Sequence, residues 1–202
     1  AVESDPVSAF GGVVLVNRRI DKKLAELLYK KFYEIILAPK FNTLSLKILT
    51  SKKNLIIINS SNLNETNNKT FKSVNSGTLY QDFNSYKISK SEIKLVSKRK
   101  SSNKMLEDLI FAYKVAKHVK SNAIVLANNK QTLGIGAGQM SRVDSTKIAI
   151  MKYKQCFNNK SFVCASDAFF PFTDNIKILL KLKCEAIIQP RGSINDKKII
   201  EY

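Results

Sequence analysis

The stretch GVVLVNRRIDKKLAELLYKKFYEIILAP, residues 12–39, sets the pattern from which the fold class is predicted. It holds two short apolar runs, residues 12–16 and 34–38, each rich in Val, Ile and Leu. Runs of this length and composition predict buried strands. A glycine pair precedes the first run and Pro39 ends the second, as is common at strand ends. The two runs therefore predict two strands separated by a connecting segment.

The connecting segment predicts a helix. Asp21 is suited to cap it, and the helix is expected to continue to about Phe32. The residues expected on its buried face are Leu24, Leu27 and Leu28. A short amphipathic helix over residues 44–49 and a strand over 55–58 follow. Strands that alternate with helices along the chain are typical of layered α/β folds, so α/β is the predicted class.

The remainder of the chain continues this alternation. Ser102 is expected to cap a long helix that runs to about residue 119. Apolar runs at 123–127 and 132–135 flank the sequence Asn-Asn-Lys, which favours a β-hairpin. A helix over 142–154 and strands over 162–165 and 186–189 complete the expectation. Residues 59–77, in contrast, are dominated by Asn, Ser, Thr and Lys and predict a polar surface excursion rather than a domain.

The composition indicates a folded protein outside the membrane. With 202 residues, 44% hydrophobic and 25% charged, the chain can bury a substantial core. It has no apolar run of about 18 residues to span a bilayer, and its first residues do not form a signal peptide. Three cysteines without C-x-x-C spacing favour reduced thiols, buried in the core, in a cytoplasmic protein. The absence of an initial Met suggests a chain that begins inside a longer one.

A formal net charge of +18 leaves two interpretations open. A positive charge of this size attracts anions, including nucleic acids and phosphorylated small molecules. However, the basic residues are mostly Lys, are spread along the whole chain, and have few aromatic residues among them. A genome with a biased composition produces the same appearance. We therefore expect no specific nucleic-acid binding and keep a nucleic-acid-binding module as the alternative function.

Three segments contain residue types that bind phosphorylated heterocycles: residues 8–12, 134–142 and 166–174. In α/β folds ligands bind where strands give way to helices, because backbone N–H groups and helix N-termini are exposed there. Glycines would allow close approach of the backbone to the ligand, and Arg142 would add a permanent charge. The G-x-G-x-G at 134–138 fits no nucleotide-binding fingerprint, and a tight turn explains it equally well.

Two other kinds of chemistry fit the sequence poorly. Zinc deaminases carry H-x-E with P-C-x-x-C, whereas His118 is followed by Val-Lys and no cysteine pair occurs. No metal site is therefore expected. A serine hydrolase would need G-x-S-x-G, which is also lacking.

The three segments together resemble the AICAR transformylase domain of bifunctional purine biosynthesis enzymes. The matching strings are SDPVSAFGG at 4–12, VKSNAIV at 119–125, GIGAGQMSRV at 134–143 and ASDAFFPF at 165–172. Their order and spacing also match, and the likeness runs from about residue 5 to 196. Departures are Thr173 and Asn195, each where an Arg is usual, and Arg191 in the segment before Asn195.

The resemblance implies a cytidine-deaminase-like arrangement of two related α/β halves, here about 1–97 and 98–202. It implies that both ends of the domain are truncated and that the IMP cyclohydrolase domain is absent. The implied reaction is transfer of the formyl group from 10-formyltetrahydrofolate to AICAR in IMP biosynthesis, in a homodimer with shared active sites. The whole protein is expected to carry IMP cyclohydrolase activity as well.

The resemblance also assigns residues to roles. Catalytic orienting residues are Asn122 and Arg142. The implied nucleotide-binding residues are Phe10, Gly11, Glu34, Ser141 and Phe169. The implied folate-side residues are Val143, Pro171, Phe172 and Asp174.

The implied chemistry needs alignment of a weakly nucleophilic amine with the formyl carbon, removal of a proton and donors for an oxyanion. A good general base is not found among Asn122, Arg142, Phe10 and Phe169. The family's Lys-His pair lies in a K-H-x-N-P-C-G motif that this chain lacks, and the Lys-His at 117–118 lies elsewhere in the pattern. We therefore expect the chain alone to be inactive, and a remnant of a decaying gene is a second alternative.

Overall fold

The computed structural model describes residues 2–63 and 69–202, which form two compact units. One unit is Pro6–Ser85, and the other combines the first residues of the chain, up to Asp5, with Tyr86–Tyr202. We refer to them as the amino-terminal unit and the carboxy-terminal unit and describe each by itself. Both contain helices and strands, so the predicted α/β class is confirmed at the level of a mixed α/β fold.

The amino-terminal unit contains a three-stranded parallel sheet in the order β1-β2-β3. Its strands are β1 (Gly12–Leu15), β2 (Tyr33–Ala38) and β3 (Ile56–Asn59). The crossovers contain α1 (Lys22–Tyr29) and α2 (Thr43–Thr50). Parallel neighbours joined through helices are the expected outcome of the β-α-β-α pattern, and all five predicted elements are present.

Side-chain caps fix the starts of both helices. Asp21 accepts a hydrogen bond from the Leu24 N–H at 2.8 Å, as predicted, and Asn42 accepts one from the Ser45 N–H at 2.6 Å. Two expectations for α1 were wrong. The helix ends at Tyr29 instead of about residue 32, and Leu27 is 55% exposed. Ala25 and Leu28, three positions apart on one side of the helix, supply its buried face.

A β-hairpin follows in the chain. Its strands β4 (Lys69–Val74) and β5 (Gly77–Asp82) are antiparallel, and every residue of both is exposed. The predicted excursion over 59–77 overlaps β4, which the polar composition concealed, and residues 64–68 of it lie outside the described part of the chain. The exposure of β4 agrees with the predicted surface character of this segment.

The carboxy-terminal unit is built on a four-stranded mixed sheet in the order β7-β6-β8-β9. Its strands are β6 (Ile124–Asn128), β7 (Gln131–Gly136), β8 (Phe162–Ser166) and β9 (Cys184–Ile188). β6 is antiparallel to both β7 and β8, whereas β8 and β9 are parallel. Every residue of β8 is buried, as expected for a central strand covered on both faces.

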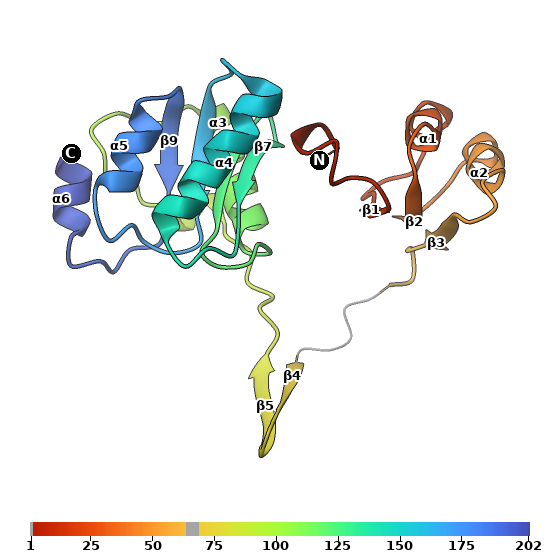
Figure 1. Cartoon of the computed structure of the whole chain (residues 1–202), viewed down its shortest axis with the longest axis horizontal. Helices are drawn as coiled ribbons and strands as arrows, with labels where there is room; N and C mark the ends of the chain where they lie inside the picture. The colour runs from red at the N-terminus through yellow and green to blue at the C-terminus, as the bar shows by residue number, and fades with distance from the viewer. Residues whose placement is uncertain (1, 64–68) are drawn as a thin grey trace. The chain divides into compact units, whose positions relative to one another are not determined.

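Helices cover both faces of this sheet (Figure 1). On one face α3 (Asn103–Ala116) packs through Leu109 and Ala112 against β6 and β8. On the other face lie α4 (Arg142–Phe157), α5 (Asp174–Leu180) and α6 (Asp196–Glu201). The unit therefore has three layers with a separate apolar core on each side of the sheet. Two short 3₁₀ turns, Val2–Ser4 and Lys90–Glu92, complete the elements.

The predicted hairpin between β6 and β7 is confirmed, and a buried carboxylate supports its turn. Asn129 and Lys130 have φ values of 51° and 54°, as a two-residue turn of the primed type requires. The carboxylate of Asp108, a buried residue of α3, accepts hydrogen bonds from the backbone N–H groups of Asn129 at 3.0 Å and Lys130 at 2.8 Å. A helix on the sheet face thus fixes the register of the hairpin.

The prediction of three buried cysteines holds only in part. Cys164 is buried and Cys184 is half-buried, but Cys156 is exposed on the outer side of α4. All three are free thiols in the described chain. Within residues 2–63 and 69–202, no helix is both long and apolar enough to cross a membrane.

Candidate functional site

Three of the sequence segments singled out above meet at one end of the carboxy-terminal sheet. Asn122 lies just before β6, Arg142 is the first residue of α4, and Asp167 follows β8 directly. Ile124 in β6 pairs with Ser166 in β8 and with Gly136 in β7, so the start of β6 adjoins the ends of both neighbours. The loop after β7 then returns the chain to the start of α4. The sheet topology therefore brings together residues that are up to 46 positions apart.

Arg142 lies at the centre of this cluster. Its Nη1 donates hydrogen bonds to the Ser166 hydroxyl at 3.0 Å and to the Asp167 carboxylate, and its Nη2 donates to Asn122 Oδ1 at 2.7 Å. Only 10% of the Arg142 side chain is exposed. A guanidinium has five N–H donors, so two remain beyond the three bonds formed to described residues. Arg142 is therefore held in one orientation, and two of its N–H groups form no bond to the described residues.

Asn122 is fixed by hydrogen bonds on both ends of its amide. Its Nδ2 donates to the backbone carbonyls of Gln139 at 2.8 Å and Met140 at 3.1 Å, while its Oδ1 accepts from Arg142. The backbone carbonyl of Asn122 also accepts from the Ser145 hydroxyl of α4 at 2.8 Å. Both amide hydrogens are thus bonded to the backbone of the loop between β7 and α4. The free hydrogen-bonding capacity of this side chain is the second lone pair of Oδ1.

Asp167 completes the cluster. It was not among the site residues predicted from the sequence. Its carboxylate accepts hydrogen bonds from the Ser121 hydroxyl, from the Ala123 N–H at 3.1 Å and from Arg142. Burial raises the pKa of this carboxyl, but the hydrogen bonds from Ser121, Arg142 and Ala123 and the charge of Arg142 outweigh burial and lower its pKa overall. Asp167 is therefore an ionised partner of Arg142. The sequence feature that could have identified Asp167 is its position just after the predicted buried strand over 162–165.

The aromatic segment after Asp167 divides between core and surface. Phe170 is completely buried in the core beneath α4 and α5. Phe169 and Phe172 are 39% and 63% exposed. An exposed aromatic ring next to a polar cluster can stack on a flat ligand. The segment therefore contributes one ring to the core and leaves two rings exposed.

The residues assigned to the folate side lie around the starts of two adjacent helices. Val143 is the second residue of α4, and Asp174 is the first residue of α5. Thr146 of α4 donates to Asn175 Oδ1 of α5 at 2.6 Å and thereby ties these helix starts together. The carbonyl of Pro171 accepts from Asn195 Nδ2 at 2.8 Å. Asn195, one of the departures from the family pattern, therefore supports the segment on which Phe172 lies.

The glycines at 134–138 have a structural role that the sequence did not reveal. A Cβ on Gly134 would lie 2.1 Å from the carbonyl oxygen of Ala149, and one on Gly136 would lie 1.8 Å from that of Ser145. Both glycines thus allow α4 to pack directly on β7. Gly138 has φ of +69°, which fits a turn residue. The expectation that these glycines allow a ligand to approach is wrong for Gly134 and Gly136, because α4 occupies that space.

Three predicted nucleotide-site residues, Phe10, Gly11 and Glu34, belong to the amino-terminal unit and lie close to one another there. The ring of Phe10 lies 5.0 Å from that of Phe32, and the N–H of Gly11 donates to the Phe32 carbonyl at 3.1 Å. A Cβ on Gly11 would lie 3.7 Å from Glu34 Oε1. Phe10, Gly11 and Glu34 therefore lie near the amino-terminal ends of β1 and β2. Ser141, the remaining one, caps α4 through the Val143 N–H at 3.2 Å.

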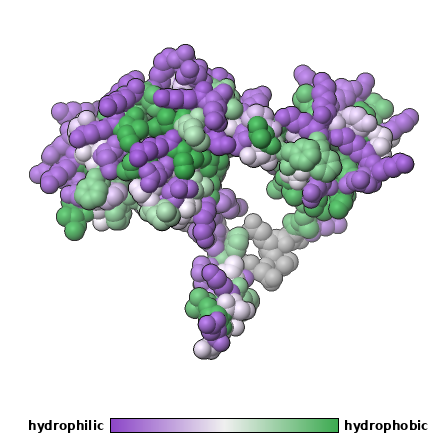
Figure 2. Space-filling view, in the orientation of Figure 1, coloured by the Kyte–Doolittle hydropathy of each residue, from purple (hydrophilic) through white to green (hydrophobic). Residues whose placement is uncertain are grey.

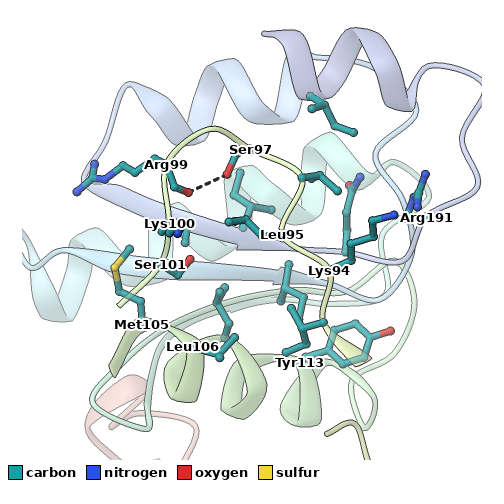
Figure 3. Close-up of a pocket in the computed structure, with 18 of the residues that line it drawn as sticks. Lys94, Leu95, Ser97, Arg99, Lys100, Ser101, Met105, Leu106, Tyr113 and Arg191 are labelled. Atoms are coloured by element: carbon teal, nitrogen blue, oxygen red, sulfur yellow. Dashed lines mark hydrogen bonds between the residues drawn. The ribbon is translucent and has the colours of Figure 1, made fainter. Parts of the chain in front are cut away.

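The Lys-His pair at 117–118 and a further cavity include none of the residues that bond to Arg142. His118 is exposed and follows the end of α3, and Lys117 donates to the Tyr86 carbonyl at 2.9 Å. Among the described residues, no three His, Cys, Asp or Glu side chains lie together as a metal site would require. A cavity of about 560 Å³ lies between β9, α3 and the segment before α3. Leu95 and Leu106 are among the residues that line it, and Arg99 and Arg191 lie on opposite sides of the view in Figure 3. None of the predicted site residues is among the described residues that line it.

The distribution of hydrophilic side chains on the visible surface does not indicate a second site. Figure 2 shows them spread over the visible face of each unit and of the hairpin instead of gathered on one element. This distribution agrees with the even spread of lysines along the sequence.

Comparison with known proteins places the chain in one family. The model of the family described as the AICARFT/IMPCHase bienzyme matches residues 1–152. A bifunctional purine biosynthesis protein PurH of Caldicellulosiruptor bescii is 50% identical over 202 residues, which covers 98% of this chain and 38% of that protein. The PurH proteins of Fusobacterium nucleatum and Aquifex aeolicus are 48% and 46% identical, and each match covers 100% of this chain and 39% of the relative. The chain thus spans well under half the length of these relatives. With three quarters of its residues matched by the family model, it belongs to the AICARFT/IMPCHase bienzyme family.

Proposed function

We propose that the whole protein transfers a formyl group from 10-formyltetrahydrofolate to AICAR, and that this chain supplies part of the binding surface for both. We further propose that the whole protein carries IMP cyclohydrolase activity, as the family description and the names of its relatives indicate. The observation that carries the proposal is the convergence of three family motifs on Arg142, which bonds to Asn122, Ser166 and Asp167.

The chemistry of formyl transfer fits a site of this kind. The amine of AICAR is a weak nucleophile, because its lone pair is delocalised into the ring and toward the carboxamide. Catalysis therefore depends on alignment of the amine with the formyl carbon and on donors for the developing oxyanion. Arg142 has two N–H groups beyond its bonds to described residues and a charge that does not titrate. We assign it to a carbonyl or oxyanion oxygen of the reacting groups.

Asn122 has a more indirect role in this proposal. Its two amide hydrogens are bonded to the backbone of the glycine-rich loop, and its Oδ1 already holds Arg142. We therefore assign it chiefly to orientation of Arg142, with one oxygen lone pair available to an AICAR amine or amide hydrogen.

The exposed rings provide stacking surfaces. Phe169 lies two residues after Asp167, and we assign it to the flat heterocycle of AICAR. Phe172, which is more exposed, is assigned with Val143, Pro171 and Asp174 to the folate. Phe10, Gly11, Glu34 and Ser141 are assigned to the nucleotide. Residues of about 1–97 and 98–202 are proposed to be the two halves of a cytidine-deaminase-like domain, which acts as a cytoplasmic homodimer with active sites shared between subunits.

We propose that the proton-handling group lies outside the residues assigned above. The only histidine, His118, is exposed and lies outside the Arg142 cluster, and the 202 residues contain no K-H-x-N-P-C-G motif. We therefore propose that the chain alone contributes binding groups and does not turn over substrate.

The experiment is a comparison of formyl transfer by the whole protein and its variants, followed as tetrahydrofolate formation. Arg142→Ala is expected to lower kcat/KM by at least about 100-fold, in the range for loss of one oxyanion donor. Glu107→Gln is the matched control: it alters an exposed ion pair between Glu107 of α3 and Lys130 of the β6–β7 turn, and it is expected to leave kcat/KM unchanged. Full activity of the Arg142→Ala variant would remove Arg142 from the site. Turnover by the isolated chain would show that the proton-handling group lies within it.

A further inference from the structure

The carboxylate of Asp167 connects the three segments of the candidate site and was not among the residues assigned to it. One oxygen, Oδ1, accepts from the Arg142 guanidinium and from the Ala123 N–H at 3.1 Å. The other, Oδ2, accepts from the Ser121 hydroxyl. The backbone N–H of Asp167 donates in turn to the Ala123 carbonyl at 3.2 Å. Both oxygens and the adjoining backbone are therefore fixed to the segment that begins β6.

We propose that Asp167 is a positioning residue, whose carboxylate sets the orientation in which Arg142 presents its remaining N–H groups to AICAR. This inference rests on the proposed function, because it names the group through which the binding residue Arg142 acts. The proposal assigns Asp167 no contact with the substrate.

The burial of the pair supports this role. The Arg142 and Asp167 side chains are 10% and 16% exposed, so both charges are largely removed from water. A buried cation is stabilised only when a partner of opposite charge and good geometry replaces its hydration. Among the described residues, Asp167 is the only ion-pair partner of Arg142. Ser166 and Asn122 are neutral, so without the Asp167 charge Arg142 would gain by turning toward water.

The geometry explains why the orientation matters. The guanidinium is planar, and its Nη1 and Nη2 are anchored on different strands, Nη1 on residues at the end of β8 and Nη2 on Asn122 before β6. Because the bonds of Nη1 and Nη2 lie in the plane of the guanidinium, they fix the direction of its two remaining N–H groups. If the Asp167 anchor is weakened, Ser166 alone holds Nη1, and the plane can rotate about the Asn122 bond.

The inference also bears on what Arg142 recognises. A guanidinium paired with a buried carboxylate presents N–H donors with little net charge. Such a group suits a neutral carbonyl oxygen, such as that of the AICAR carboxamide or the formyl group, better than a phosphate dianion. Binding that depends on Asp167 should therefore change little between low and moderate salt.

A double-mutant cycle separates positioning from a general structural role. The whole protein, Asp167→Asn, Arg142→Ala and the double variant are titrated with AICAR by calorimetry, with Glu107→Gln as the control. If Asp167 acts through Arg142, Asp167→Asn weakens AICAR binding about tenfold in the presence of Arg142 and not at all in the Arg142→Ala background. Glu107→Gln is expected to bind AICAR like the unaltered protein.

Each outcome bears on a distinct claim. Equal AICAR affinity of Asp167→Asn and the unaltered protein, or the same loss with and without Arg142, would overturn the positioning role while leaving the proposed function intact. Failure of the unaltered protein to bind AICAR would overturn the proposed function and the inference with it. If Asp167→Asn does not fold, as judged by circular dichroism, Ser121→Ala replaces it in the cycle. That variant removes one hydrogen bond from Oδ2 and is expected to weaken binding about threefold, again only when Arg142 is present.

Discussion

Oδ1 of Asn122 accepts a hydrogen bond from Nη2 of Arg142 at 2.7 Å, across 20 positions of sequence. The two residues expected to orient the substrates are thus one bonded unit. Asn122 is held by the loop after β7, and Arg142 opens the helix that follows this loop. Alteration of either residue is therefore expected to disturb the other.

The first prediction concerns Asn122. Asn122→Ala removes three side-chain hydrogen bonds and is expected to lower the free energy of unfolding by about 1–3 kcal/mol. The Met140 carbonyl loses its side-chain donor, and the Gln139 carbonyl keeps only the backbone N–H of residue 122 at 3.4 Å. Urea denaturation measures this loss. Asn17→Ala, at an exposed position of the amino-terminal unit, is the control and is expected to have no measurable effect. Equal stability of the two variants would show that the Asn122 bonds contribute nothing to stability.

The second prediction concerns the glycines under α4. Gly134→Ala places a Cβ 2.1 Å from the Ala149 carbonyl oxygen and should destabilise the protein by more than about 3 kcal/mol or prevent folding. Gly77→Ala is the matched control, because nothing lies within 4 Å of its added Cβ. Thermal unfolding of both variants tests the difference. A Gly134→Ala variant with the same unfolding temperature as the unaltered protein would contradict the close packing of α4 on β7.

The third prediction concerns the hairpin that Asp108 supports. Asp108→Ala leaves the N–H groups of Asn129 and Lys130 without their acceptor and should lower the free energy of unfolding by about 2–3 kcal/mol. Glu107→Ala, at the neighbouring exposed position of α3, should change it by less than about 0.5 kcal/mol. Urea titration of both variants gives the comparison, and equal losses would contradict a specific role for the buried carboxylate.

The fourth prediction follows from the lowered pKa of Asp167. A carboxyl whose pKa is lower in the folded chain than its unfolded value of about 3.9 stabilises the fold above that value, and this stabilisation is lost as pH falls through the folded pKa. The stability difference between the unaltered protein and Asp167→Asn should therefore be constant from about pH 7 to pH 5 and shrink below about pH 4. Urea unfolding at a series of pH values tests this. A difference that grows on acidification would contradict an ionised Asp167 paired with Arg142.

Much of the fold follows from local sequence signals. The strand runs, the capping residues Asp21 and Ser102 and the Asn-Asn-Lys turn depend on neighbours in sequence, and the structure confirms each of them. The length of α1 and the exposure of Leu27 were predicted wrongly, since helical periodicity alone does not show which side of a short helix meets the sheet. Strand β4 was missed because its residues are all exposed and polar composition alone does not reveal such a hairpin.

The site was accessible from the sequence only in part. Asn122 and Arg142 could be singled out because they lie in recognisable motifs next to predicted strand ends. The role of Asp167 depends on the antiparallel pairing of β6 with β8, which places Ser166 opposite Ile124 and which no local pattern specifies. The packing role of Gly134 and Gly136 likewise depends on where α4 lies.

The central claim is that Arg142 binds the nucleotide, and the most direct test is a crystal structure of the whole protein with AICAR. The account predicts an oxygen of AICAR within about 3.2 Å of a guanidinium nitrogen of Arg142, with the heterocycle against Phe169 and the Asp167 bond retained. AICAR bound elsewhere, with the Arg142 cluster unchanged and in contact only with water, would contradict it.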